Sequence, residues 1–134
     1  MLGIDFGDKK IGLAISDELG VTVHPLGQYI RKSSQEDKDY FKELIKKYNI
    51  SQVVIGLPIR MDGTKGKRVQ KTEEFGKWLQ GIINVPISFW DERLSTKQAI
   101  ELLKTRKMKW RERKKHKDQI SAAIILFSYL ESRR

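Results

Sequence analysis

The first sixteen residues constrain the fold more than any other stretch, because they place two β-prone apolar runs around a short polar tip. Leu2 and Ile4 are apolar, yet Asp5 follows them within the first run. Gly7 and Gly12 bracket the polar tip, which indicates a β-hairpin. An ionised carboxylate inside a strand is costly unless it reaches solvent or joins a site. Asp5 is therefore either an acid beside a turn or part of a functional site.

Composition narrows the class of protein. The chain has 134 residues, which fits one domain spanning residues 1–134. Lys and Arg number 27 against 17 Asp and Glu, a formal net charge of +10 that favours nucleic acid as the partner, ahead of an anionic membrane. Cysteine is absent, which excludes disulfides and thiolate metal sites. We expect a cytoplasmic protein without a membrane partner, because neither a spanning segment nor a signal-peptide layout is present.

The remaining patterns predict an α/β protein. A β-rich run over residues 21–30 contains Pro25, which predicts an edge strand or a bulge. Apolar residues then recur at helical or strand spacing along the rest of the chain. The expected elements are a helix over 33–49, a buried strand over 52–57, a loop over 58–68, a helix with apolar residues from 69 to 83, a strand over 86–90, a helix over 94–103 and a helix from 118 to about 132.

The order of these elements predicts how the sheet is built. Three strands in succession suit an antiparallel meander, and the later strand–helix alternation suits right-handed parallel crossovers. We therefore expect a five-stranded mixed sheet flanked by helices. No repeat, linker or readable dimer interface stands out in the sequence.

Acidic residues recur where such a sheet places its ligands. Asp5 lies in the first strand, Asp91 and Glu92 end the last strand, and Asp118 opens the last helix. Ligands of open sheets gather beyond the carboxyl ends of parallel strands. Carboxylates brought together there would repel one another, and a hard divalent cation such as Mg²⁺ or Mn²⁺ would relieve the repulsion. Such ions support phosphodiester cleavage, although unrelated surface acids would produce the same spacing.

Two basic segments flank these acids. Nine of the fourteen residues from 104 to 117 are Lys or Arg, and the segment directly precedes Asp118. Positive flanks around an acidic site suit a phosphate-backbone substrate. Trp110 is able to stack on a base or pack on the body, while His24 and His116 are best explained as solvated. The expected phosphate contacts are Arg60, Lys65, Lys67, Arg68, Arg111, Arg113, Lys114, Lys115 and Lys117.

Four ordered motifs resemble a known family. They are Asp5-Phe-Gly with Lys10-Ile-Gly, Gly56-Leu-Pro with Met61-Asp-Gly-Thr, Asp91-Glu-Arg-Leu-Ser-Thr, and Asp118 before Ser121-Ala-Ala-Ile-Ile-Leu. Together they resemble the YqgF family of RuvC-like, RNase H-fold proteins, described as Holliday junction resolvases and as nucleases that process pre-16S rRNA.

The resemblance carries specific expectations for this chain. It implies the strand order 3-2-1-4-5 and a two-metal site with catalytic and metal-binding acids at Asp5, Glu92 and Asp118. Asp91 should point to the opposite face if the strand continues. Lys10, Arg93 and Ser95 join the expected nucleic-acid contacts.

The sequence departs from the family pattern at two places. RuvC-type resolvases carry a further acid one turn after the helix Asp, where this chain has Ser121, and many relatives have Asn where this chain has Arg60.

From the motifs and the charge together we expect a metal-dependent endonuclease on structured nucleic acid, acting at the 5′ end of the 16S rRNA precursor. The alternatives are a Holliday junction resolvase and a non-cleaving RNA-binding maturation factor. A nucleotide-driven kinase or ATPase is disfavoured. Asp5-Phe-Gly resembles the phosphate loop of the actin-like superfamily, but those enzymes close two such domains on the nucleotide, and no Walker A or G-x-G-x-x-G pattern is present here.

Overall fold

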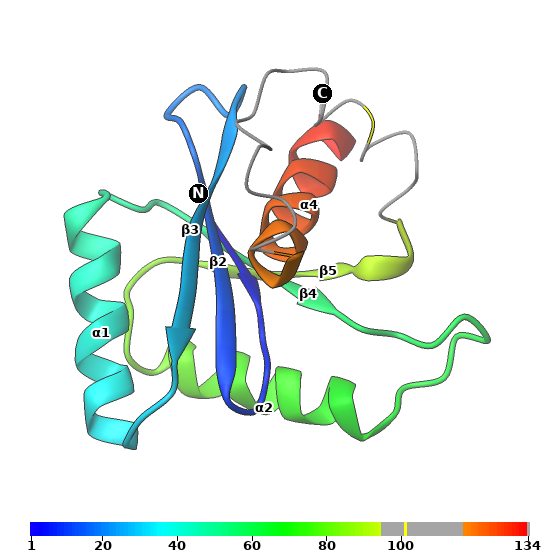
Figure 1. The fold of residues 1–134 in the computed structure, drawn as a ribbon, viewed down its shortest axis with the longest axis horizontal. Coiled ribbons are helices and arrows are strands. Elements are labelled where there is room, and N and C mark those ends of the chain that lie inside the picture. Colours follow the sequence, from blue (N-terminus) through cyan, green and yellow to red (C-terminus); the bar gives the residue numbers. More distant parts are fainter. Residues whose placement is uncertain (95–100, 102–116, 134) are drawn as a thin grey trace.

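A five-stranded mixed sheet forms the centre of the molecule, with the strand order β3-β2-β1-β4-β5 (Figure 1). The computed structural model describes residues 1–94, 101 and 117–133, with residues 117–119 as backbone only. β1 pairs with β2 in the antiparallel sense and with β4 in the parallel sense, and β5 extends the parallel side. The predicted sheet is thus confirmed. The strands are β1 (Leu2–Asp5), β2 (Lys10–Ser16), β3 (Val23–Ile30), β4 (Val53–Leu57) and β5 (Ile87–Asp91).

Helices cover both faces of this sheet (Figure 1). α1 (Ser34–Lys47) and α2 (Lys67–Gln80) pack on one face, α4 (Lys117–Ser132) packs on the other, and the short 3₁₀ helix η1 (Glu92–Leu94) follows β5. The helix expected over 94–103 and the basic segment 104–117 lie almost entirely outside the described residues. Within the part of the chain that is described, no helix has the length and apolar character to cross a membrane.

β3 lies at the edge of the sheet, as its proline predicted. Pro25 pairs with Ala14, and the register between β2 and β3 shifts between Leu13 and Ala14, so both the edge position and the irregularity are present. The strand begins at Val23 rather than at residue 21, because the carboxylate of Asp17 accepts hydrogen bonds from the backbone N–H groups of Val21 and Thr22, at 2.7 and 3.3 Å.

The two loop-to-helix junctions show how local chemistry sets the helix starts. Ser33 caps α1 as expected, since its hydroxyl accepts a hydrogen bond from the backbone N–H of Glu36 at 3.1 Å. The loop expected over 58–68 is shorter than predicted, because α2 begins at Lys67. Gly66 adopts an extended conformation as the N-cap, and its carbonyl accepts from the backbone N–H of Gln70 at 3.3 Å.

Strand alternation divides the core into two layers. Leu2 and Ile4 of β1 pack with α1 and α2, whereas Gly3 between them faces α4. A Cβ on Gly3 would lie 2.7 Å from the Cβ of Leu126 and 2.9 Å from the carbonyl oxygen of Ala122, so α4 rests directly on the β1 backbone. Residues of β1 that point the same way as Gly3 therefore face α4.

The direction of α4 follows from which residues it places over each end of β1. Ala122 and Leu126 lie over Gly3, and Leu130 lines a pocket beside Met1 at the amino end of the strand. The helix therefore runs antiparallel to β1. Its first turn, which includes residue 118, points towards the edge at which β1, β4 and β5 end.

Candidate active site

Asp5 is the last residue of β1 and lines a concave surface. Its position two residues after Gly3 places it on the α4 side of the sheet. The side chain is half-buried and lines a pocket with a volume of about 360 Å³. Asp5 thus belongs to a pocket at the carboxyl edge of the sheet rather than to an exposed turn.

Glu92 approaches the same edge from a different segment. It begins η1 directly after β5, and β4 separates β5 from β1 in the sheet. Burial, and after it the negative charge of Asp5, raise the pKa of Glu92 to about 7, while the positive charge of Arg68 acts in the opposite direction. Because such coupling falls with distance, the carboxylates of Asp5 and Glu92 lie close enough to repel each other.

Basic residues surround the Asp5 pocket. Lys10, the first residue of β2, and Arg68, in the first turn of α2, both line it. The Arg68 guanidinium also donates to the carbonyl oxygen of Phe6 at 3.4 Å, which ties α2 to the residue after Asp5. The pocket therefore combines a carboxylate with cations able to hold a phosphate group.

Two residues of this pocket were missed by the sequence analysis. Lys9 and Gln28 line it together with Gly12. Gln28 reaches the pocket because it pairs with Gly12 across β2 and β3. That register depends on the irregularity between β2 and β3. Pro25 predicts such an irregularity but does not show at which residues the register shifts. Lys9 belongs to the polar tip of the predicted hairpin, where a lysine is common and gives no sign of a binding role.

The residues on either side of Glu92 are locked to each other. The Arg93 guanidinium donates to both carboxylate oxygens of Asp91, with Nη2 at 2.7 Å from Oδ2 and Nε at 3.1 Å from Oδ1. The backbone N–H of Arg93 also donates to Asp91 Oδ1 at 2.9 Å. This pairing lowers the pKa of Asp91. The hydrogen bonds between Arg93 and Asp91 thereby fix the turn that carries Glu92.

Gly56 lies beneath Glu92, at the level of Asp5 in the sheet. Ile4 pairs with Ile55, so Gly56 is the next residue of β4 towards the carboxyl edge. A Cβ on Gly56 would lie 2.5 Å from Cδ1 of Ile125 and 3.1 Å from Cγ of Glu92. The absence of a side chain lets α4 and Glu92 share one position over β4.

We expect Gly56→Ala to displace both neighbours. The added methyl should destabilise the fold by about 1–3 kcal/mol and lower any activity that needs Glu92 in place. Thermal unfolding and the rate of nucleic-acid cleavage measure the two effects separately.

Gly81→Ala is the matched control for this substitution. Its Cβ would meet nothing closer than 3.5 Å, so stability and activity should stay near those of the parent. Adding Ile125→Val to Gly56→Ala removes the atom at 2.5 Å and should restore stability more than activity, because the contact with Glu92 remains. Unchanged stability of Gly56→Ala would contradict the packing of α4 on β4.

The other predicted site residues are placed as follows. Asp118 lies in the first turn of α4, where only its backbone is described, and Ser121 is half-buried one turn later. Lys65 pairs with Glu73 at 3.8 Å, and Arg60 and Lys67 are exposed. Among the residues with described side chains, no three acids or histidines form a ready metal cluster. Outside the description lie Ser95, Arg111, Arg113, Lys114 and Lys115, together with the side chain of Lys117.

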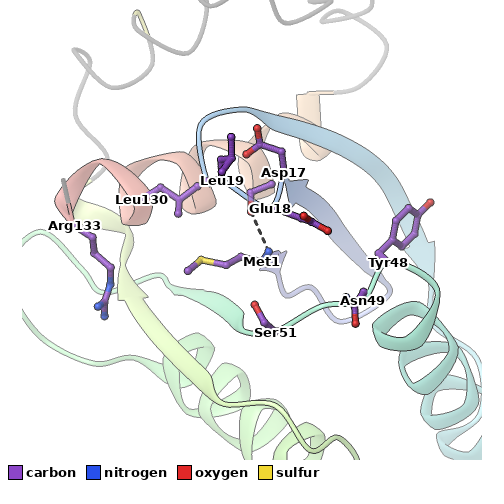
Figure 2. A pocket seen from close by; sticks show the side chains of 11 residues that line it. Met1, Asp17, Glu18, Leu19, Tyr48, Asn49, Ser51, Leu130 and Arg133 are labelled. Carbon is purple, nitrogen blue, oxygen red and sulfur yellow. Dashed lines mark hydrogen bonds between the residues drawn. The ribbon is translucent and has the colours of Figure 1, made fainter.

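A second pocket, of about 430 Å³, lies at the opposite edge of the sheet (Figure 2). Its lining includes the acidic residues Asp17 and Glu18, and the Met1 ammonium donates to the hydroxyl of Ser16 at 3.0 Å. The two cations of this pocket, Arg133 and the Met1 ammonium, are matched by its two carboxylates. In the pocket of Asp5, by contrast, Lys9, Lys10 and Arg68 outnumber the acid, which suits a phosphate backbone better. The carboxyl edge is therefore the better candidate for the functional site.

Solved structures of low sequence identity share this fold. A Thermus thermophilus RuvC structure, in complex with a Holliday junction substrate, matches with a TM-score of 0.66 at 16% identity, covering 99% of this chain and 96% of RuvC. A Holliday junction resolvase from fowlpox virus matches with a TM-score of 0.57 at 13% identity, covering 98% and 97% of the two chains. At these identities the matches define a RuvC-like fold.

Sequence comparison then identifies the family. The family model "RuvX: Holliday junction resolvase" matches residues 1–132, so the chain belongs to this family, which confirms the motif resemblance. A relative from Halothermothrix orenii is 42% identical over 130 residues, covering 97% of this chain and 93% of its own. One from Caldanaerobacter subterraneus is 42% identical over 135 residues, covering 100% and 97%. Both relatives carry the name "Putative pre-16S rRNA nuclease".

Proposed function

We propose that this protein is a metal-dependent endonuclease that cleaves structured nucleic acid at the carboxyl edge of its sheet. The observation that carries the proposal is the meeting of Asp5 and Glu92. They come from segments far apart in sequence, and the charge of Asp5 raises the pKa of Glu92. Two carboxylates that repel each other destabilise a folded protein, and groups with such raised pKa values are concentrated at functional sites.

The donor set fits a hard divalent cation, Mg²⁺ or Mn²⁺. Asp5 and Glu92 offer carboxylate oxygens, and we assign Asp118 as the third acid because the first turn of α4 points to the same edge. When bound, such cations activate water and stabilise the leaving oxygen of a phosphodiester. Lys10 and Arg68 hold the substrate phosphate beside Asp5. Arg93 closes the turn that orients Glu92.

The substrate we favour is the 5′ end of the 16S rRNA precursor, in the cytoplasm. Support comes from the relatives at 42% identity that are named for this RNA. The family description and the RuvC complex support a second candidate, a four-way DNA junction. Ser121, where RuvC-type resolvases have an acid, weighs towards RNA.

One assay separates these functions. The purified protein is incubated with labelled precursor RNA, with a fully paired RNA duplex and with a four-way DNA junction, each with Mn²⁺ or with EDTA. We expect products from the precursor RNA only when Mn²⁺ is present. Products from DNA alone would assign the resolvase activity instead. Binding to all three substrates without products would support a non-cleaving maturation factor.

Neutralising three lysines at the junction between the basic segment and α4 should weaken binding to every nucleic acid. Replacing Lys114, Lys115 and Lys117 with glutamine should reduce the magnitude of the slope of log K, the binding constant, against log salt by about 2. The reason is that each phosphate contact releases counterions on binding, and three such contacts would be removed. A salt titration of RNA binding measures this slope.

The control changes the same amount of charge elsewhere. Lys42, Lys46 and Lys47 are exposed on α1, on the face of the sheet opposite α4. Their replacement with glutamine should change the slope far less. Equal effects of the two triple variants would mean that net charge alone matters, and that the segment before α4 is not a contact surface.

A further inference from the structure

The loop between β4 and α2 displays a large apolar side chain to solvent. Met61 is 88% exposed, and the loop that carries it extends beyond the carboxyl edge of the sheet (Figure 1). A single exposed apolar residue is ordinary on a protein surface. Three features of this loop distinguish Met61: the turn is held in one shape, it lies beside the candidate active site, and its neighbours include the basic residues Arg60 and Lys65.

Hydrogen bonds hold the turn that presents Met61. The carbonyl of Arg60 accepts from the backbone N–H of Gly63 at 2.8 Å, and the backbone N–H of Arg60 donates to the carbonyl of Thr64 at 3.2 Å. The carboxylate of Asp62 accepts from both the backbone N–H and the hydroxyl of Thr64, at 2.9 and 2.6 Å. Gly63 has a φ of 87°, which suits glycine. A preformed turn loses little conformational entropy when its tip binds.

The turn lies against the segment that carries Glu92. A Cβ on Gly63 would lie 3.6 Å from Nη1 of Arg93, the residue that follows Glu92. Arg93 is itself fixed by both carboxylate oxygens of Asp91. A ligand that touches Met61 is thus held at a set position relative to the proposed catalytic acids.

Basic side chains flank the apolar tip. The guanidinium of Arg60 lies against Gly66, where a Cβ would be 2.8 Å from Nη2. The side chain of Lys65 is 59% exposed. An apolar centre with cationic flanks complements a nucleic acid, whose base faces are apolar and whose backbone is anionic.

We propose that Met61 inserts between neighbouring bases at a branch or unpaired step of structured RNA. Apolar side chains, methionine among them, unstack base steps in this way in other nucleic-acid-binding proteins. Unstacking costs least where pairing is already interrupted, so the wedge selects such sites over continuous duplex. The inference rests on the proposed function, since it explains how substrate structure is recognised beside Asp5 and Glu92.

Binding without cleavage tests this inference separately from the nuclease activity. The full chain carrying Asp5→Asn is titrated into an RNA three-way junction with 2-aminopurine at the branch, and into a continuous duplex of the same composition. We expect the fluorescence to rise on binding to the junction. Met61→Ser should weaken junction binding about tenfold, abolish the rise and change duplex binding less than twofold. Met61→Phe should preserve the rise.

Leu19→Ser is the matched control, because Leu19 is 85% exposed but lines the pocket at the opposite edge (Figure 2). It should leave both binding constants and the fluorescence unchanged. The inference is overturned if Met61→Ser retains the rise, if it weakens both RNAs equally, or if the Asp5→Asn protein does not bind the junction. A Met61-dependent rise in a protein that never cuts RNA would leave the wedge standing while the proposed function fails.

Discussion

Asp5→Asn is expected to reduce metal-dependent cleavage at least about 1000-fold, because an amide cannot supply the anionic oxygen that a divalent cation requires. The fold should persist, since asparagine has nearly the same shape and removes a charge that repels Glu92. Single-turnover cleavage and thermal unfolding of the same preparation measure the two effects.

Asp8→Asn is the appropriate control for the loss of one carboxylate. Asp8 is exposed and pairs with Lys71 at 3.4 Å, three residues beyond Asp5 in the chain. Its replacement should alter the cleavage rate by less than about threefold, as expected for an exposed ion pair. Cleavage by Asp5→Asn at the parental rate would remove Asp5 from the catalytic machinery.

Glu92→Gln should have opposite effects on activity and on stability. Without bound cations, burial and the charge of Asp5 raise the pKa of Glu92 to about 7, from an ordinary value of 4.5. The folded state then binds more protons than the unfolded state between these values, so the stabilising contribution is present below pH 4.5 and is lost as pH rises through 7. Glutamine does not ionise, so the Glu92→Gln variant avoids this loss of stability at high pH.

At pH 8 the Glu92→Gln variant should therefore be more stable than the parent by about 1–2 kcal/mol, after allowance for solvent screening of a partly exposed carboxyl. At pH 4 the two proteins should unfold at similar temperatures. Cleavage should fall at least about 100-fold, because a ligand to the cation is lost. Thermal unfolding of both proteins from pH 4 to 8 checks the stability, and a difference between Glu92→Gln and the parent that does not grow across this range would contradict the raised pKa of Glu92.

The sequence predicts the sheet well because edge strands, helix starts and the order of elements are each marked by short stretches of sequence. Pro25 marks the edge strand, Ser33 marks the start of α1, and the alternation of strands and helices implies the parallel side. The convergence of Asp5 and Glu92 follows from the same rules, because the ends of parallel strands meet at one edge.

The contacts that shape the site are not local, so they were not predicted. Gly56 serves α4 and Glu92 together, which depends on how closely a helix approaches a strand. Gln28 enters the pocket only through the register of an irregular strand pair. Arg93, one of the expected nucleic-acid contacts, also pairs its guanidinium with the carboxylate of Asp91 on the other side of Glu92, a contact set by the turn after β5.

The apolar spacing of α4 allows one stripe through Ile120 and Ile124 and another through Ala122 and Ile125. In the structure Ile120 and Ile124 are only partly buried, while Ala122 and Ala123 are fully enclosed. The small alanines are buried because α4 lies directly on the sheet, at positions where larger residues would hold it away.

Anomalous diffraction from crystals soaked in Mn²⁺ is the most direct test of how the acids are used. The account predicts ions bound by the carboxylates of Asp5 and Glu92, with Asp118 as a further ligand, and no such ions at this edge in Asp5→Asn crystals. Ions bound at another surface of a protein that still cleaves RNA would contradict it.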